Sequence, residues 1–235
     1  MILGENVALP PVPLPIDEPI TSPRVLVCEG AGDKNFFEQL IKERQLPDFY
    51  ITYPREEFEG GGGKSKFAVR LRSLRLQHGF DLVKGIIVAG DNDRDQQSSF
   101  ANVRKLILDS GYKPPNKPLQ TVRGDPAVCI MMIPFGEDGQ LETLCLRAIK
   151  DAWPTIYQCA EDYANCSGIS GNWSPGKIER AMLRALTAHI CKKDPNTSLS
   201  HHWHDGREIV IPLGHQCFTP LADFMAGFDG AIADA

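Results

Sequence analysis

The chain has 235 residues, of which 42% are hydrophobic and 23% are charged, and its formal net charge is -5 at pH 7. This length suits one domain of ordinary size with additions, and the composition excludes fibrous and wholly disordered proteins. The acidic balance argues against a protein that binds nucleic acid through bulk positive charge, although a local basic strip or a bound cation could still hold phosphate.

Nothing in the sequence indicates a membrane or secreted protein. No run approaches the ~20 apolar residues that cross a bilayer. The first residues, 1–6, lack the basic start and apolar core of a secretory signal. The seven cysteines form no CxxC pair, and several, such as Cys28 and Cys129, lie within apolar runs. We therefore expect reduced, mostly buried cysteines in a cytoplasmic protein with no membrane partner.

The first 22 residues contain five prolines and three acidic residues but no Lys or Arg. They predict a flexible, proline-rich arm, with order beginning at Arg24. From there, short apolar runs alternate with segments whose apolar residues have helical spacing. The predicted strands are 24–28, 49–53, 85–89 and 128–133, and the helices between them are 34–45, 64–78 and 99–110.

Strands that alternate with helices predict an α/β fold, with a mostly parallel central sheet flanked by helices over residues 23–135. The rest of the chain, 136–235, predicts a mainly helical extension packed on this core. Its predicted helices are 141–150, 155–165, 177–191 and 220–228, with a short edge strand at 208–211. In parallel sheets the active crevice lies beyond the carboxyl ends of the strands, where Glu29 and Asp91 are expected.

Three acidic residues, Asp91, Asp93 and Asp95, alternate directly after the strand predicted at 85–89. Carboxylates that leave a rigid strand together can converge on one point, and a divalent cation offsets their mutual repulsion. Hard oxygen ligands of this kind select Mg²⁺ or Mn²⁺. A solvated acidic turn is the alternative interpretation of the same pattern.

A further carboxylate, Glu29, follows the first strand and precedes Gly30 and Gly32, where the backbone can approach a ligand closely. Asp33 comes at the start of the next helix, where capping explains it at least as well as chemistry does. Glu142 stands in the first turn of a later helix. It either faces the acidic site as an outer partner or simply favours the helix dipole.

Two segments resemble the Toprim domain: Val27-Cys28-Glu29-Gly30 followed by Asp33, and the run from Val88 to Asp95. Toprim domains occur in topoisomerases, DnaG-type primases, OLD-family nucleases and RNA maturation nucleases. They are marked by a Glu after the first strand and a DxD, sometimes DxDxD, after a later one. The resemblance covers roughly residues 24–134. It is closest to small bacterial Toprim-like proteins and to the Toprim components of ATPase-linked phage-defence systems.

This resemblance implies a Rossmann-like core in which Glu29 is the general acid/base. Asp91 and Asp93 would hold Mg²⁺ or Mn²⁺, with Asp95 as a third or outer ligand. The chain has no room for the tyrosine domain of a topoisomerase and no zinc module of a primase. The resemblance therefore implies a nuclease that hydrolyses DNA or RNA, with an ATPase partner supplying affinity that an acidic protein lacks. A silent module that binds metal, nucleotide or protein stays open, as does a small-molecule phosphotransferase or phosphatase.

The glycines 60–63 with Lys64 and Ser65 look like the end of a P-loop, but GxxxxGK[ST] needs Gly at position 58, which is Phe58. Glycine amides beside a helix N-terminus can still bind an anion. We therefore predict that Gly63 and Lys66 bind substrate phosphate and that Lys64 acts at the phosphate during catalysis. The arginines that follow are expected on a solvated helix face: Arg70, Arg72 and Arg75.

Histidines and tryptophans gather in the second half of the chain. The zinc-like set fits no established zinc signature, and its members are His201, His202, His204, His215 and Cys217. The tryptophans are expected to pack the helical extension, with base stacking as the alternative, and they are Trp153, Trp173 and Trp203.

Overall fold

The computed structural model describes residues 18–54, 63–190 and 211–235. Its centre is a five-stranded sheet of order β2-β1-β3-β5-β4. The first four strands in this order run parallel, and β4 pairs antiparallel with β5 at one edge. The strands are β1 (Arg24–Val27), β2 (Tyr50–Thr52), β3 (Gly85–Asp91), β4 (Thr121–Val122) and β5 (Ala127–Ile133). The predicted α/β fold with a mostly parallel sheet is confirmed. β4 was not predicted, because two residues carry no periodic pattern.

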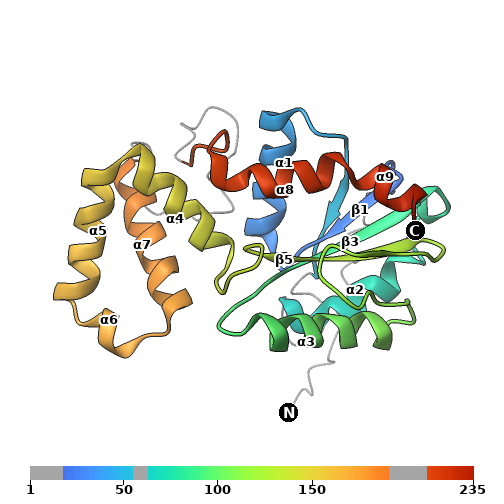
Figure 1. Ribbon diagram of the computed structural model, residues 1–235, viewed down its shortest axis with the longest axis horizontal. Helices are drawn as coiled ribbons and strands as arrows, with labels where there is room; N and C mark the ends of the chain where they lie inside the picture. The colour runs from blue at the N-terminus through green and yellow to red at the C-terminus, as the bar shows by residue number, and fades with distance from the viewer. Residues whose placement is uncertain (1–17, 55–62, 191–210) are drawn as a thin grey trace, which may run out of the picture.

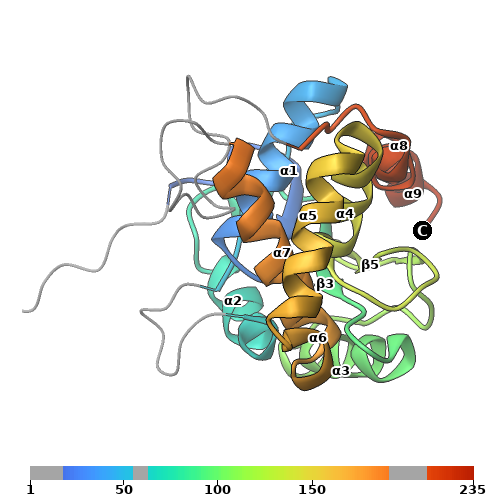
Figure 2. The same cartoon turned by 90° about the vertical axis from the view of Figure 1, so that its left-hand side faces the viewer.

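Helices cover both faces of the sheet (Figures 1 and 2). One layer contains α1 (Ala31–Arg44), the 3-10 turn η4 (Gln216–Phe218), α8 (Thr219–Ala226) and α9 (Phe228–Ala233). The other contains η1 (Lys64–Lys66), α2 (Phe67–Leu74) and α3 (Gln96–Asp109), with η2 (Phe80–Leu82) leading into β3. Because strand side chains alternate, Leu26 and Ile87 pack under the first layer while Val27 and Val88 pack under the second.

A group of helices follows β5 and lies beyond the carboxyl edge of the sheet (Figure 1). It consists of α4 (Leu141–Ala152), α5 (Pro154–Cys166), α6 (Ile169–Asn172) and α7 (Pro175–Ile190). The chain then returns to the sheet, where Phe218, Leu221 and Phe228 are buried in the same core as Phe36. The predicted helical extension therefore has two parts, because α8 and α9 complete a layer of the core instead of standing apart from it.

Packed structure begins before Arg24. Ile20 is buried against the α2 layer, and its amide donates a hydrogen bond to the carbonyl of His78 at 2.8 Å. The prediction that order begins at Arg24 is wrong, because one buried side chain in a proline-rich stretch produces no periodicity. The rest of the predicted arm, 1–17, lies outside the described residues. So does most of the predicted edge strand, of which only Ile211 is described, as a buried bend.

The arginines of α2 hold neighbouring elements together. Arg70 is 2% exposed, and its Nε donates to Thr52 Oγ1 at 2.8 Å. Arg72 and Arg75 donate to backbone carbonyls at the end of α3, at 3.4 and 2.9 Å. The predicted solvated helix face is therefore wrong for Arg70. Charge and spacing do not reveal that this side of α2 packs against a strand.

The described residues bear on two further predictions, which concern membrane-spanning segments and the burial of the cysteines. None of the described helices combines the length and the hydropathy that a membrane crossing requires. Among the cysteines that the structure describes, all are free thiols: three are buried, Cys217 is half-buried, and Cys159 and Cys166 on α5 are exposed. The expectation of mostly buried cysteines thus holds for the strands and α4 but not for α5.

Candidate functional site

The order of the sheet reverses between β1 and β3. From β1 the chain passes through α1 to β2 on one side, and it then returns to form β3 and β5 on the other. A binding crevice forms beyond the carboxyl ends of the strands at such a reversal. Glu29 follows β1 and Asp91 ends β3, and the Asp91 amide donates to Glu29 Oε1 at 2.9 Å. The structure thus brings together the two acids that the strand pattern placed at this edge.

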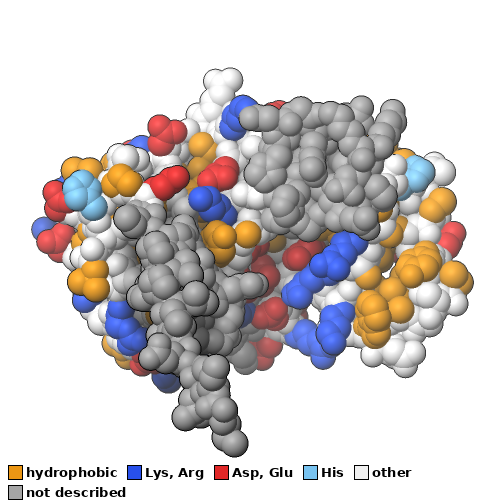
Figure 3. Space-filling view, turned by 180° about the vertical axis from the view of Figure 1, so that it is seen from behind, with side chains coloured by type: hydrophobic (Ala, Val, Ile, Leu, Met, Phe, Trp, Pro, Cys, Tyr) orange, Lys and Arg blue, Asp and Glu red, His pale blue; other side chains and the backbone are white. Residues whose placement is uncertain are grey.

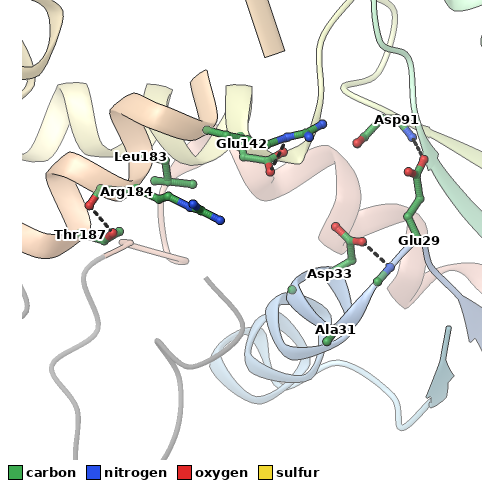
Figure 4. Close-up of a pocket in the computed structure, with 11 residues that line it drawn as sticks. Glu29, Ala31, Asp33, Asp91, Glu142, Leu183, Arg184 and Thr187 are labelled. Carbon is green, nitrogen blue, oxygen red and sulfur yellow. Dashed lines mark hydrogen bonds and ion pairs between the residues drawn. The ribbon is translucent and has the colours of Figure 1, made fainter. Parts of the chain in front are cut away.

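A cavity of about 390 Å³ opens at this edge, and we call it the acidic cavity (Figure 4). Four carboxyl side chains line it, those of Glu29, Asp33, Asp91 and Glu142. Gly30 and Gly32 line the same cavity, so six of the residues that the sequence singled out meet here. The opposite wall comes from α7 and consists of Arg180, Leu183, Arg184 and Thr187.

The N-termini of two helices hold these carboxylates. Asp33, in the first turn of α1, accepts a hydrogen bond from the Gly30 amide at 2.8 Å, so it does take part in capping. Asp91 Oδ1 accepts from the amide of Leu141, the first residue of α4, at 3.0 Å. Helix N-termini favour negative charge, which explains how two acids are tolerated side by side.

Burial and mutual repulsion shift the protonation of the cavity. Burial raises the pKa of Asp91 well above its usual range, and the charges of Glu29, Asp33 and Glu142 raise it further. Burial also raises the pKa of Asp33, to about 7, again with help from Glu29 and Glu142. The pKa of Glu29 rises through burial, opposed by its hydrogen bond from Asp91 and by the nearby Lys64 ammonium. These carboxylates resist ionisation together, and a cation would offset that resistance.

We expect metal-free protein to lose thermal stability as the pH rises from about 4 to about 7. The pKa of Asp33 is higher in the folded than in the unfolded chain, so the folded state binds more protons across this window and is weakened as they leave. Thermal unfolding in EDTA across this range measures the effect. Asp33→Asn should flatten the pH dependence, while Asp81→Asn, at an exposed position, should not. Identical pH curves for Asp33→Asn and wild type would contradict this explanation.

Lys64 does not line the acidic cavity, but it contacts acids that follow β1 and β3. Its Nζ donates to Asp93 Oδ2 at 2.5 Å and to the Asp91 carbonyl at 3.0 Å, and it is 3.8 Å from Glu29 Oε1. The structure thus brings this predicted residue among the acids. Gly63, whose φ of +97° favours glycine, begins the turn that presents Lys64. Neither Gly63 nor the predicted phosphate ligand Lys66 lines the acidic cavity.

The predicted metal ligands Asp91, Asp93 and Asp95 do not face one point. Asp93 has a φ of +53°, and its backbone exchanges hydrogen bonds with Gly139 at 2.8 and 2.7 Å. This turn directs Asp93 toward a second cavity, of about 730 Å³, between α3 and α7. Asp95 lines that cavity too and caps α3, accepting from the amides of the first turn, which lowers its pKa. Alternation would align the three only in an extended strand, and β3 ends at Asp91.

The carboxylates of the acidic cavity have the donor chemistry that a divalent cation needs, but they do not form a complete set of ligands. Within residues 18–54, 63–190 and 211–235, no three His, Cys, Asp or Glu side chains are placed to hold one ion together. The carboxyl oxygens that line the cavity are the ligands that Mg²⁺ and Mn²⁺ prefer. Asp91 and Glu142 line it together and are the residues that would hold the ion.

The zinc-like set can be described only in part, because His201, His202 and His204 lie outside the described residues. His215 contacts the carboxylate of Asp151 at 3.0 Å, and Cys217 contacts a backbone carbonyl of α4. Both contacts connect the η4 region to α4 and need no metal.

The sequence analysis missed the basic residues of α7. Lys177, Arg180 and Arg184 are exposed and lie three and then four positions apart, so they share one side of the helix. Arg180 lies 3.5 Å from Glu142 in the acidic cavity, and Arg184 lines the same cavity. The spacing could have revealed a basic stripe. It could not have revealed that α7 lines a cavity together with the residues at the carboxyl ends of the strands.

Fold and site together define an α/β protein with an acidic cavity at the reversal point of a mostly parallel sheet, one wall of which carries arginines from an added helical group. The chain belongs to the family described as "Protein of unknown function (DUF3226)", which matches residues 23–203. The match extends from β1 through α7, so both walls of the acidic cavity lie within it. No solved structure matches the chain.

Proposed function

We propose that this protein is a metal-dependent phosphodiester hydrolase, a nuclease acting on DNA or RNA. The observation that carries the proposal is the meeting of Glu29, Asp33, Asp91 and Glu142 in one cavity whose other wall contains arginines. Phosphodiester hydrolysis needs carboxylates that bind a divalent cation, together with residues that attract phosphate. The resemblance to Toprim domains supports the same reaction.

Each side chain has a role in this proposal. Bound Mg²⁺ or Mn²⁺ would neutralise charge on the attacked phosphate and favour ionisation of a water nucleophile. Asp91 and Glu142 would hold the ion, whose charge would also offset that of Asp33 in the same cavity. Glu29 accepts the proton from water, because its raised pKa makes the carboxylate a stronger base. Lys64, which contacts Glu29 and Asp93, would reach the scissile phosphate.

The proposed activity is tested with purified protein and labelled single-stranded and duplex DNA and RNA, in Mg²⁺, Mn²⁺ or EDTA. We expect cleavage that depends on the metal. Asp91→Asn keeps an oxygen to accept the Leu141 amide but removes the charge, so it should abolish the heat of Mg²⁺ binding in calorimetry together with cleavage. Asp109→Asn, in an exposed ion pair on α3, is the matched control. Metal binding and cleavage that survive Asp91→Asn would refute the proposal.

A second candidate is a catalytically silent module that binds metal, nucleotide or protein. The Lys64 ammonium favours it, because it contacts Asp93 and Glu29 where a catalytic cation is expected. In that case the same assay would give no cleavage with any metal. The formal charge of -5 predicts weak affinity for nucleic acid in isolation, so we also propose that an ATPase partner assists the protein. Repeating the assay with a candidate partner and ATP distinguishes a silent module from a dependent one.

A further inference from the structure

The acidic cavity and the second cavity are adjacent, and α7 borders both. Arg180 lines the two cavities at once, Lys177 lines the second, and Arg184 lines the acidic one. We call these three residues the α7 basic stripe. Seven positions separate its ends, which is about 10 Å along a helix. Figure 3 views the molecule from behind, and Lys and Arg side chains lie there beside a line of acidic ones.

The cations of the stripe are available to a ligand. Among the residues that the structure describes, Lys177 and Arg184 form no ion pair, and both are exposed. Arg180 is 57% exposed at its side chain; its Nε lies 3.5 Å from Glu142, and its Nη2 donates to Gln140 Oε1, which leaves further N–H groups of the guanidinium for a ligand. A guanidinium at that distance can turn to an incoming phosphate, which it binds in bidentate fashion.

Carboxylates also line the second cavity, but they are engaged elsewhere. Asp93 pairs with Lys64, and Asp95 caps α3. Asp138 accepts from the amide of Gln96 at 3.3 Å. The fourth, Glu179, accepts from the Thr143 hydroxyl at 2.9 Å, and burial raises its pKa. Lys64 offsets the charge of Asp93, and the raised pKa of Glu179 favours its neutral form, while Asp95 stays ionised. The field along the stripe is therefore less negative than a count of four carboxylates suggests.

We propose that the α7 basic stripe binds the phosphate backbone of single-stranded nucleic acid and leads it from the second cavity into the acidic one. This inference rests on the proposed function and specifies its substrate as a polynucleotide strand instead of a small phosphorylated molecule. A stripe of about 10 Å reaches more than one phosphate of a strand. Cavities of about 390 and 730 Å³ have the volume of small-molecule sites, which is enough to admit unpaired nucleotides.

An exposed aromatic residue lies at the outer end of the stripe. Trp173 is 47% exposed and immediately precedes Ser174, which lines the second cavity. An exposed indole beside a basic groove can stack on an unpaired base, and such stacking tolerates any sequence. This placement supports a single strand over a duplex, whose bases are already stacked.

Fluorescence anisotropy with a labelled 12-nucleotide strand tests the proposal, using Ca²⁺ and, separately, EDTA so that binding is measured without cleavage. The triple variant Lys177→Gln/Arg180→Gln/Arg184→Gln should weaken binding about tenfold or more. It should also lower the slope of log affinity against log salt by about 2, because each phosphate contact on a single strand contributes about 0.7. Trp173→Ala should weaken binding further without changing that slope.

The control is Lys113→Gln/Lys117→Gln/Arg123→Gln, which removes three exposed charges from the loops between α3 and β5. Equal affinity and salt slope in the two triple variants would overturn the proposal, as would duplex DNA binding as tightly as the single strand, or a wild type that binds neither. Binding that depends on the stripe in a protein that never cleaves would refute the proposed hydrolase while supporting the stripe. Cleavage that survives loss of the stripe with unchanged affinity would do the reverse.

Discussion

Replacing Glu29 with Gln is expected to lower phosphodiester cleavage by about 10²–10⁴-fold, the usual contribution of a general acid or base. Gln keeps an oxygen that can accept the Asp91 amide, so the connection between β1 and β3 survives. The variant loses only the group that takes up a proton. Rates over a series of pH values in saturating Mg²⁺ measure the loss.

The same substitution should stabilise the metal-free protein at neutral pH, because it removes one charge from the acidic cavity. Loss of activity with a gain in melting temperature separates a residue kept for chemistry from one kept for folding. Glu38→Gln, on α1 and paired with Lys34, is the control and should change neither the cleavage rate nor the melting temperature appreciably. A Glu29→Gln protein that cleaves at the wild-type rate would refute the assignment of Glu29.

Replacing Lys64 with Met is the second large effect that we expect. Without the ammonium, Glu29 and Asp93 lose their shared cation and repel one another. Metal-free protein at pH 8 should lose about 1–3 kcal/mol, the range for hydrogen bonds to charged groups, which lowers its melting temperature by several degrees. Mg²⁺ should restore the lost stability and should bind several-fold more tightly than to wild type, because the competing ammonium is gone. Cleavage should nevertheless fall, since Lys64 no longer reaches the phosphate.

Lys105→Met provides the matched comparison, since it removes the same charge from an exposed ion pair on α3, away from the acidic cavity. Thermal unfolding with and without Mg²⁺, together with calorimetry, reads out both proteins. Weaker Mg²⁺ binding in Lys64→Met than in wild type would show that the ammonium assists the metal instead of competing with it. An unchanged melting temperature would show that the ion pairs contribute nothing to the folded state.

The sequence alone determined the four parallel strands of the sheet and the edge at which Glu29 and Asp91 lie. Apolar runs such as 85–89 and 128–133 are long enough to identify buried strands, and parallel strands place the residues after their carboxyl ends at one edge. Glu29 and Asp91 could therefore be assigned to the same corner although 62 positions separate them. The start of the helix also made capping one of the two interpretations of Asp33, and the structure shows that capping contact.

Only the tertiary structure decided which groups share a cavity. The alternation of Asp91, Asp93 and Asp95 predicted three converging carboxylates, but a positive φ at Asp93 and the cap at Asp95 separate them. Glu142 and two residues of the α7 basic stripe, Arg180 and Arg184, complete the site because α7 packs against α4, whose first turn lies at the ends of the strands. The periodicity of apolar residues along a strand or helix indicates which face of that element is buried. It does not indicate against which distant element that face packs, because the packing depends on the shapes of both surfaces.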